Sequence, residues 1–442
     1  MKFFRRKKKA KKDIFEKGEF NLKNIDTLSS HRFMVSLLYA NDFVNTIYPA
    51  CASCYGISED KNKDYDKKIS YIGRRVAAGH TSILEHSNIV VQAYIALTEE
   101  DKISAAYDHN PFIKPELTDY DDSMQDIISL VSEVKDVCRY LTIYTDYFFD
   151  SEKNPIMKMT IGGSIRGFRY IYENIENRHN RLFISIFKVL KTVIPAEFFM
   201  DFINDEVMDD YNTIEITKEL QENIQIFSNT SKSNNEYIDI INMDNLKHIS
   251  KLLNLDIEKC FDFVSITVDF KKMSRIITQQ LTRHRNGITQ ESQRYVNYSD
   301  AKFNSPAEFK DKYNKEEKYD TPFGKFTLQE LGDFMSGTYE YLIAQGIEKE
   351  DARGYLPMNI QCSNLFMTFT LRTLFVFIHL RTDKHAQAEI RMYADLLSNM
   401  TESYSFELGM DSMKNAAEFY SQPLYKIEQL RDNLYDDIDE EV

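Results

Sequence analysis

The residues of this chain best suited to chemistry gather in the stretch RHRNGITQESQRY. It places Arg283, His284, Arg285 and Arg294 close together, with Ser292 between them and few apolar side chains. An arginine is always charged and offers a planar fork of donors, which matches the oxygens of phosphates and carboxylates two at a time. Several converging arginines repel one another unless an anion lies between them. The stretch therefore predicts a binding site for an anionic ligand.

Three other segments carry charged or titratable side chains that could join this site. They are GHTSILEH at 79–86, DARGYLP at 351–357 and LRTLFVFIHLRTDKHAQ at 371–387. Taken singly, an arginine on a helix usually lies on a solvated face, and the histidines of GHTSILEH could be ordinary helix-end residues. The histidines do not follow the spacing of metal ligands, so no metal site is predicted. Ser292 lacks an evident general base, so we expect it to bind a phosphate oxygen.

The composition confines such an anion site to one part of the molecule. The chain has 442 residues, is 43% hydrophobic and carries a formal net charge of −14. This length allows two or three domains or one elaborated domain. The net charge argues against a general nucleic-acid binder, although the basic segment MKFFRRKKKAKK could contact nucleic acid as a solvated tail.

The sequence gives no sign of a membrane or secreted protein. No run is apolar enough to span a bilayer, and the N-terminus lacks the apolar core of a secretory signal. The five cysteines are scattered, which favours reduced thiols and a cytoplasmic location over a disulfide framework. Cys51 and Cys54 form a C-x-x-C pair, which is a weak candidate for redox or metal chemistry.

Periodicity predicts the elements that position these residues. Helical patterns occur within 31–56, 67–86, 124–149, 180–195, 271–285, 331–346 and 385–400. Strand-like alternation covers 88–97 and 261–270. Residues 300–335 are polar and are predicted to link two elements. The segment MTIGGSIRGFRYI at 159–171 loosely repeats MTFTLRTLFVFI at 367–378, which indicates a similar supersecondary unit in both places.

The four motifs, in this order, resemble those of the flavin-dependent thymidylate synthases, the ThyX family. That family has R-H-R, a gap, then a serine followed by x-R-Y, as in RHRNGITQESQRY here. GHTSILEH resembles its G-H-x-[ST]-x-x-E-H segment, and ARGYLPMN resembles its A-R-x-x-L-P-x-N turn. LRTLFVFIHLRTDKHAQ resembles its closing R-x8-R-x-D-x-H-A-Q segment. Six residues separate Arg285 from Ser292, one fewer than the family usually has.

The resemblance implies an α+β fold, with a mostly antiparallel sheet flanked by helices and a mainly helical insert. The expected parts are a basic tail at 1–34, a ThyX-like part at 35–97, the insert at 98–259, a catalytic part at 260–400, and a C-terminal helix with an acidic tail at 401–442. The implied reaction converts dUMP to dTMP with FAD, NADPH and methylenetetrahydrofolate. The implied assembly is a homotetramer with shared active sites.

The resemblance also assigns roles to individual residues. Arg381 would be the catalytic arginine, because its fixed charge beside the uracil stabilises the ionised ring. The positions implied for dUMP are Gln280, Arg283, Gln290, Glu291, Ser292, Gln293, Arg294, Arg353 and Arg381. The positions implied for FAD are His80, Ser82, Arg283, His284, Arg285, Gln290, Thr370, Arg372 and His385.

Two other functions are compatible with the same residues. One is an enzyme of this type that modifies a related pyrimidine nucleotide. The other is a degenerate fold kept as a binding or scaffold protein, which the retained arginines argue against. A bound flavin would favour the two enzyme hypotheses over the scaffold hypothesis.

Overall fold

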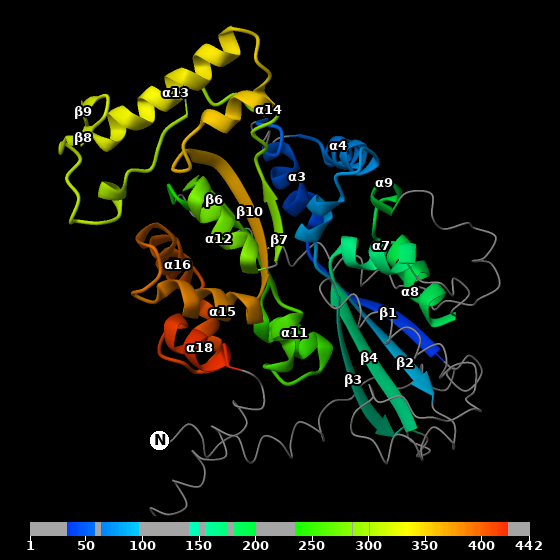
Figure 1. Ribbon diagram of the computed structural model, residues 1–442. Coiled ribbons are helices and arrows are strands. Elements are labelled where there is room, and N and C mark those ends of the chain that lie inside the picture. The colour runs from blue at the N-terminus through cyan, green and yellow to red at the C-terminus, as the bar shows by residue number, and fades with distance from the viewer. Residues whose placement is uncertain are drawn as a thin grey trace, which may run out of the picture.

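The structure is a computed structural model, and it describes residues 33–57, 63–96, 141–149, 155–174, 181–199, 235–284, 286–299 and 301–422. In these ranges the chain forms two four-stranded antiparallel sheets and one short hairpin (Figure 1). This confirms the predicted α+β class. All but the last two residues of the predicted basic tail lie outside the described residues, as does the acidic C-terminal end.

The first sheet has the strand order β1-β2-β4-β3. Its strands are β1 (Phe33–Ala40), β2 (Ile89–Ala96), β3 (Leu141–Phe149) and β4 (Pro155–Gly163). The helices of this part are α3 (Phe43–Ser53), α4 (Tyr65–Ala77), η3 (Thr81–His86), α7 (Ile165–Asn174), α8 (Arg181–Lys191) and α9 (Ala196–Phe199). Buried aliphatic and aromatic side chains from these strands and helices form one core, including Leu37, Ile72, Leu84, Met159 and Phe168.

The second sheet has the strand order β5-β6-β10-β7. Its strands are β5 (Ile238–Met243), β6 (Ser265–Ser274), β7 (Gly287–Gln290) and β10 (Gln361–Thr370). The helices are α11 (Leu246–Leu253), η5 (Lys259–Asp262), α12 (Arg275–Leu281), η6 (Thr282–His284), α15 (Leu371–Thr382), α16 (Ala388–Met400), α17 (Glu402–Leu408) and α18 (Met413–Tyr420). Their buried side chains form a second core, which includes Val268, Phe270, Phe375 and Tyr393.

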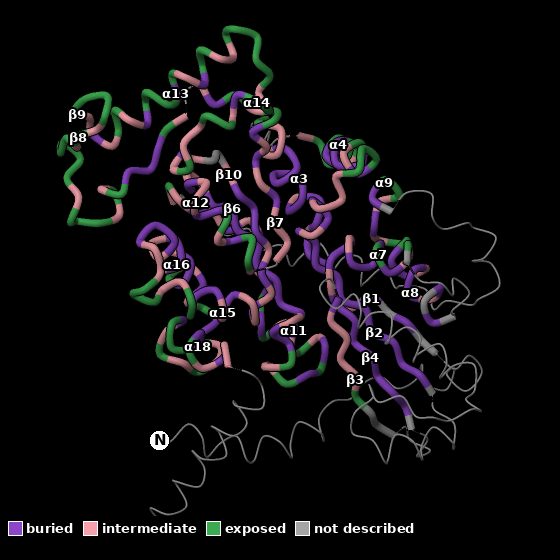
Figure 2. The backbone as a smooth tube through the Cα atoms, viewed as in Figure 1, coloured by how far each residue is buried: buried purple, intermediate pink, exposed green. Residues whose placement is uncertain are grey.

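An arm projects from the second sheet (Figures 1 and 2). It consists of η7 (Pro306–Glu308), the hairpin of β8 (Tyr319–Thr321) and β9 (Gly324–Phe326), α13 (Leu328–Ala344), α14 (Lys349–Ala352) and η8 (Arg353–Tyr355). A capping box between Thr327 and Glu330 starts α13. Only a small core supports the arm, so much of α13 is exposed.

The strands predicted at 88–97 and 261–270 are confirmed as β2 and β6, although β6 begins only at Ser265. The helical pattern is wrong at 33–40 and at 141–149, where the chain forms β1 and β3. In both places a hydrogen-bonded neighbour strand decides the outcome: β2 pairs with β1, and β4 pairs with β3. Local periodicity does not contain this long-range pairing.

The predicted insert at 98–259 contributes to both sheets in its described ranges. It supplies β3 and β4 to the first sheet and β5 to the second, together with α7, α8, α9 and α11. The echo between 159–171 and 367–378 is confirmed as one supersecondary unit, because β4 leads into α7 and β10 leads into α15. No helix in the described part of the chain combines the length and apolar character that crossing a membrane requires.

Candidate functional site

The arginine stretch lies where the second sheet meets the end of α15. β6 leads into α12 and η6, and the chain then returns as β7, which pairs with β10 from Leu365 opposite Gln290 to Thr368 opposite Gly287. β10 continues directly into α15, whose last turn carries Arg381. The topology therefore brings residues about a hundred positions apart in the sequence to one place. Arg285 lies outside the described residues.

His284 and Arg381 are in direct contact. The guanidinium Nε of Arg381 donates to Nε2 of His284 at 3.0 Å, and the ring of Phe377 meets the imidazole edge-on at 5.2 Å. Burial, and then the charge of Arg381, lowers the pKa of His284 to about 4. The imidazole is therefore neutral near pH 7. Because its Nε2 accepts a hydrogen bond, its proton is on Nδ1.

Arg283 and Arg381 are two of the arginines expected to converge, and the charge of Arg283 acts on Arg381. Burial, and then the charge of Arg283, lowers the pKa of Arg381. A guanidinium remains charged after such a shift, so the half-buried Arg381 and the exposed Arg283 repel each other. An anionic group between them would remove this repulsion. The site is consequently prepared to bind a negative charge.

A second cationic group forms on the arm side. The Nε of Arg294 contacts Oε2 of Glu350 at 2.9 Å, and the Nε of Arg353 donates to the main-chain carbonyl of Glu350 at 3.0 Å. Ser292 lies beside them, and its Oγ accepts from the backbone N–H of Arg294. The ion pair is exposed and contributes little to stability, so an anion could displace the carboxylate. Among the described residues, no hydrogen bond or ion pair joins this group to Arg381.

The remaining loop positions predicted to contact dUMP are mostly buried. Glu291 and Gln293 are almost fully covered, and Glu291 accepts a hydrogen bond from the hydroxyl of Tyr298. Gln290 is half-buried at the end of β7. The buried glutamate and glutamine shape the loop, whereas the half-buried Ser292 and exposed Arg294 remain accessible from outside.

Helix α3 and the segment after it hold the loop in position. The backbone N–H of Ser292 donates to the carbonyl of Cys54 at 3.3 Å, and the Sγ of Cys54 lies 3.6 Å from the carbonyl oxygen of Gln290. Tyr55 stacks on Tyr295 at 5.4 Å and meets the ring of His80 edge-on at 5.7 Å. These contacts place His80 beside the arginine stretch.

The C-x-x-C pair has an anchoring role rather than redox activation. Burial raises the pKa of Cys51 to about 12 and the pKa of Cys54 to about 11. Both thiols are therefore protonated near pH 7, and neither is a reactive thiolate. Within the described residues, no group of three or more histidine, cysteine or carboxylate side chains could hold a metal ion.

The GHTSILEH segment forms η3 and packs against β7. A methyl group on Gly287 would lie 2.8 Å from Cβ of Glu85 and 3.0 Å from its carbonyl oxygen, so only glycine allows this approach. Ser82 lies half-buried on the same short helix. The structure thus places the residues predicted at His80 and Ser82 next to the arginine stretch.

Three predicted FAD positions have partners elsewhere in the fold. Arg372 forms a two-fold contact through its Nε with Asp262, at 2.8 and 2.7 Å. Thr370 caps the N-terminus of α15, and His385 is exposed and contacts Asp383 at 2.8 Å. None of the three has a hydrogen bond or ion pair with the described part of the arginine stretch. Their flavin contacts remain predictions.

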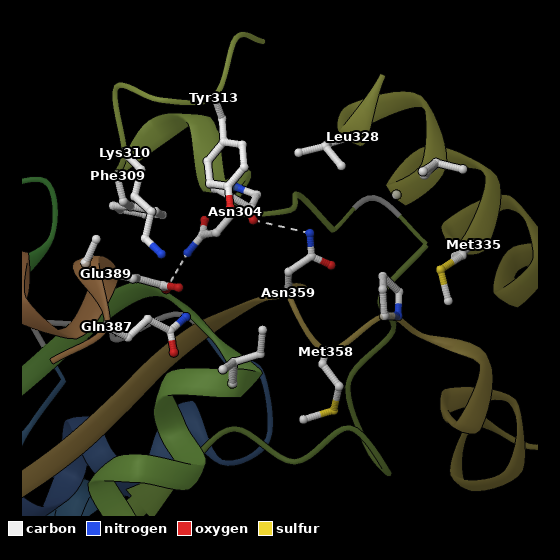
Figure 3. A pocket seen from close by; sticks show the side chains of 16 residues that line it. Asn304, Phe309, Lys310, Tyr313, Leu328, Met335, Met358, Asn359, Gln387 and Glu389 are labelled. Atoms are coloured by element: carbon white, nitrogen blue, oxygen red, sulfur yellow. Dashed lines mark hydrogen bonds between the residues drawn. The ribbon is translucent and has the colours of Figure 1, made fainter. Parts of the chain in front are cut away.

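A pocket of about 450 Å³ adjoins the N-terminal end of α12, where Ile276 lines it (Figure 3). Its wall includes Gln387, whose Oε1 accepts from Nε2 of Gln280 at 2.8 Å. Among its lining residues, buried Glu389 accepts from the amide of Asn304 at 2.7 Å and from the backbone N–H of Ser274. The pocket therefore borders Gln280, one of the positions predicted to contact dUMP. Its size is that of a small-ligand site.

Sequence reasoning missed several residues that complete the site. Tyr55, Glu350 and Gln387 were not among the predicted site positions. Gln387 belongs to the quoted D-x-H-A-Q motif, so its position in the motif was an available signal. Tyr55 and Glu350 act through contacts between segments far apart in the chain, which no local pattern reveals.

The described residues fit a polar, anionic cofactor such as a flavin nucleotide. The side-chain Nδ2 of Asn286 and Oγ1 of Thr289 are buried and lack a hydrogen-bond partner, although buried polar atoms normally have one. Asn286 lies between His284 and β7, and Thr289 lies in β7. Together with the repelling pair Arg283 and Arg381, they form a donor-rich site that lacks its complement.

Comparison with known proteins shows which proteins the chain is similar to. Residues 212–404 match the family model Thy1, described as "Thymidylate synthase complementing protein". A protein of Pyrococcus abyssi named "Flavin-dependent thymidylate synthase" is 30% identical over 161 residues, which are 36% of this chain and 64% of that protein. A protein of the same name from Geobacter sulfurreducens is 31% identical over 147 residues, 33% of this chain and 60% of the relative.

These findings confirm the resemblance predicted from the four motifs. The chain spans about three fifths of the length of each of these two relatives. A shorter match, 42% identical over 57 residues, joins 13% of this chain to 26% of a protein of the same name from Thermotoga neapolitana. The family match begins at residue 212, inside the segment predicted as an insert. The predicted division into parts remains a prediction.

Proposed function

We propose that this chain is a flavin-dependent thymidylate synthase, which methylates dUMP reductively to dTMP. The convergence of Arg283, His284 and Arg381 is the observation that carries the proposal. Methylenetetrahydrofolate would donate the carbon, and NADPH would reduce the flavin. The family match over 212–404 and the relatives named for this activity support the proposal.

Arg381 is the proposed catalytic residue. Its charge stabilises the ionised form of a uracil ring held beside it, because a fixed cation favours negative charge on the adjacent ring nitrogen and carbonyl. Neutral His284 accepts from Nε of Arg381 and so fixes the orientation of the guanidinium. Arg283 would supply a second positive charge to the same anionic ligand. Bound reduced FAD would supply the hydride for the reaction.

Ser292, Arg294 and Arg353 are the proposed ligands of the dUMP phosphate. The guanidinium groups already meet at Glu350, and the phosphate would take the place of that carboxylate. Charge-assisted hydrogen bonds to phosphate are stronger than the exposed ion pair that they replace. On the flavin side, His80, Ser82 and the orphaned atoms of Asn286 and Thr289 are the proposed contacts.

We also propose a homotetramer with shared active sites, located in the cytoplasm. The arm supports an assembly because it exposes large apolar side chains: Phe323 is 88% exposed, Phe334 70% and Tyr341 64%. Isolated chains rarely expose so many large hydrophobic residues on one projection. The protonated, unpaired thiols of Cys51 and Cys54 fit a reducing compartment.

The decisive experiment is tritium release from dUMP labelled at C5, with NADPH, FAD and methylenetetrahydrofolate supplied. We expect release to depend on all three and to yield dTMP. A yellow protein that releases tritium but forms a different methylated or hydroxymethylated nucleotide would establish the related-substrate alternative. A colourless protein that binds neither flavin nor dUMP would contradict the proposal and favour the scaffold alternative.

A further inference from the structure

The two sheets are built on the same plan. We call described residues 33–199 the first unit and described residues 235–420 the second unit. The orders β1-β2-β4-β3 and β5-β6-β10-β7 match strand for strand, and every pairing is antiparallel. In each unit a helix follows the first strand, a 3-10 helix precedes the second, and the third strand in space continues into a helix.

The match extends to single residues in the first strands. A register shift interrupts the pairing between Leu37 and Tyr39 in β1, and between Ile240 and Asn242 in β5. The strands regain register in the same way, since Ala40 pairs with Ile89 and Met243 pairs with Ile266. A shared irregularity of this kind is more informative than shared strand order, because bulges are specific local features.

The helices that follow these strands start alike. Asp42 caps α3 by accepting from the N–H of Asn45, and Asn245 caps α11 by accepting from the N–H of His248. Each cap lies three residues after the end of the register shift. The correspondence therefore runs without a gap from the strand into the helix.

Each unit contains the same ion pair. Arg166 is the second residue of α7 and pairs with Glu85 of η3, whereas Arg372 is the second residue of α15 and pairs with Asp262 of η5. Glu85 lies four positions before Ile89, and Asp262 lies four positions before Ile266, the residue that corresponds to Ile89 in the strand pairing. The strand pairing makes Arg166 equivalent to Arg372 and Glu85 equivalent to Asp262. The two arginines are 206 positions apart in the sequence.

The units meet through contacts that exchange equivalent positions. His86 of the first unit bonds Thr368 of the second, Nδ1 to Oγ1, at 2.8 Å. The corresponding residues are Phe263 of the second unit and Gly162 of the first, and they also touch: a Cβ on Gly162 would lie 2.4 Å from the ring of Phe263. Such reciprocal contacts are those of a two-fold, isologous interface.

The family motifs are divided between the units. GHTSILEH lies only in the first unit, and RHRNGITQESQRY lies only in the second. The position of Ser82 is taken in the second unit by Lys259, and the position of Gln290 is taken in the first unit by Thr145, which pairs with Met159 as Gln290 pairs with Leu365. The position that corresponds to Arg381 is residue 175, which lies outside the described residues.

Only one of the two equivalent contacts between the units therefore has site residues on both sides. On that side η3 touches β7, where Glu85 packs against Gly287. On the other side η5 faces β3, and the ammonium of Lys259 lies 5.0 Å from the ring centre of Tyr144. In the second contact, Lys259 occupies the position of Ser82, and Tyr144 occupies the position of Thr289.

We propose that each chain is an internal pair of equivalent units and holds a single composite flavin site, between η3 of the first unit and the arginine loop of the second. In this site Arg166 of the first unit supplies the flavin-side cation, and its counterpart Arg372 serves the fold through Asp262. Arg166 is tied to the loop by Glu85, which contacts both Arg166 and Gly287. The proposal rests on the flavin-binding function proposed above.

The first test is the flavin stoichiometry of the full-length protein. The protein is saturated with FAD and dialysed, and the flavin absorbance is compared with the chain concentration from amino-acid analysis. We expect one flavin per chain, whether or not dTMP is formed. Two flavins per chain would overturn the single-site proposal and leave the enzymatic function standing. No bound flavin would overturn both.

The second test compares the two equivalent arginines. Arg166→Gln and Arg372→Gln each break one of the matched ion pairs, so similar losses of folding stability are expected from both. We expect the FAD dissociation constant to rise at least tenfold more in Arg166→Gln than in Arg372→Gln, measured by flavin fluorescence with thermal unfolding in parallel. An equal rise in both variants, or a larger rise in Arg372→Gln, would overturn the assignment of Arg166.

A second matched pair removes the dependence on the ion pairs. Ser82→Ala and Lys259→Ala alter equivalent positions on η3 and η5. We expect weaker FAD binding for Ser82→Ala and unchanged binding for Lys259→Ala. Weaker binding for Lys259→Ala, with Ser82→Ala unaffected, would place the flavin at the other contact and overturn the proposal.

Discussion

Arg381 combines a charge that cannot be neutralised with a position fixed by one neighbour. The contact from its Nε to His284 leaves the rest of the fork available to a ligand. We expect Arg381→Ala to lower dTMP formation by about 10²- to 10³-fold, the usual effect of removing one charge-stabilising donor. Flavin should stay bound, because its proposed contacts lie on the loop and η3. Activity and flavin absorbance are measured on the same preparation.

Arg391→Ala is a suitable control for this variant. Arg391 lies on α16 and donates to the carbonyl oxygen of Lys384 on the surface. Its removal should change neither activity nor flavin content. If Arg381→Ala lost its flavin together with its activity, Arg381 would have a structural role instead of the proposed one.

The neutral state of His284 predicts a pH dependence of stability. Its pKa falls from an ordinary value near 6.5 to about 4 in the fold, chiefly through burial. Between these values the unfolded chain binds a proton that the folded chain does not, so stability decreases as pH falls from 6.5 towards 4. The free energy of unfolding in urea should decrease over this window. His284→Gln keeps an acceptor for Arg381 and should make the decrease smaller.

Buried His86 provides the background for this comparison. Burial lowers its pKa to about 3, so it contributes a decrease of the same sign in both proteins. The difference between wild type and His284→Gln therefore isolates His284. Identical pH profiles would show that His284 titrates normally in the folded protein.

At the scale of elements, the sequence predicted the parts whose causes are local. Strand β2 and the end of α13 follow from alternation and from Gly346, whose positive φ ends the helix. Strands β1 and β3 were mistaken for helix because their neighbours are distant in sequence. The motifs located the arginine stretch, but they could not show that α3 holds it through Cys54. That contact joins residues more than two hundred positions apart.

The close approach of η3 to β7 gives a prediction for Gly287. A methyl group there would lie 2.8 Å from Cβ of Glu85, so Gly287→Ala must push the two elements apart. We expect a loss of about 1–3 kcal/mol in stability, as for other overpacked sites. FAD binding should weaken as well, because η3 and the loop carry opposite sides of the proposed site. Urea unfolding and flavin titration measure the two effects.

Gly337→Ala is the matched control for Gly287→Ala. Gly337 lies inside α13, and an added methyl group there would meet nothing within 4 Å. Alanine favours a helix over glycine, so we expect a gain of up to about 1 kcal/mol and unchanged FAD binding. Normal flavin affinity in Gly287→Ala would show that the spacing of η3 and β7 does not matter for the cofactor.

At the scale of the molecule, buried polar contacts join the two sheets. Asp244 of the second unit is 2% exposed and accepts from Tyr39 and Asn88 of the first unit. It also accepts from Ser265 within its own unit. A buried carboxylate with several donors is costly to disturb, and it fixes one arrangement of its neighbours. The loop and η3 consequently keep a constant relation to each other.

The arm carries the last prediction, because it separates contacts within a chain from contacts between chains. If α13 forms the proposed assembly, Phe334→Asp places a charge in an apolar interface and should lower the oligomeric mass in light scattering. Phe406→Asp, at a side chain 68% exposed on α17, should leave the mass unchanged.

Flavin should remain bound to dissociated Phe334→Asp, since both sides of its proposed site belong to one chain. The dUMP dissociation constant should rise at least tenfold, because Arg353 belongs to the arm and Arg294 contacts Glu350 of the arm, where a second chain would complete the site. Unchanged mass would contradict the proposed interface, and loss of flavin upon dissociation would show that a second chain also builds the flavin site.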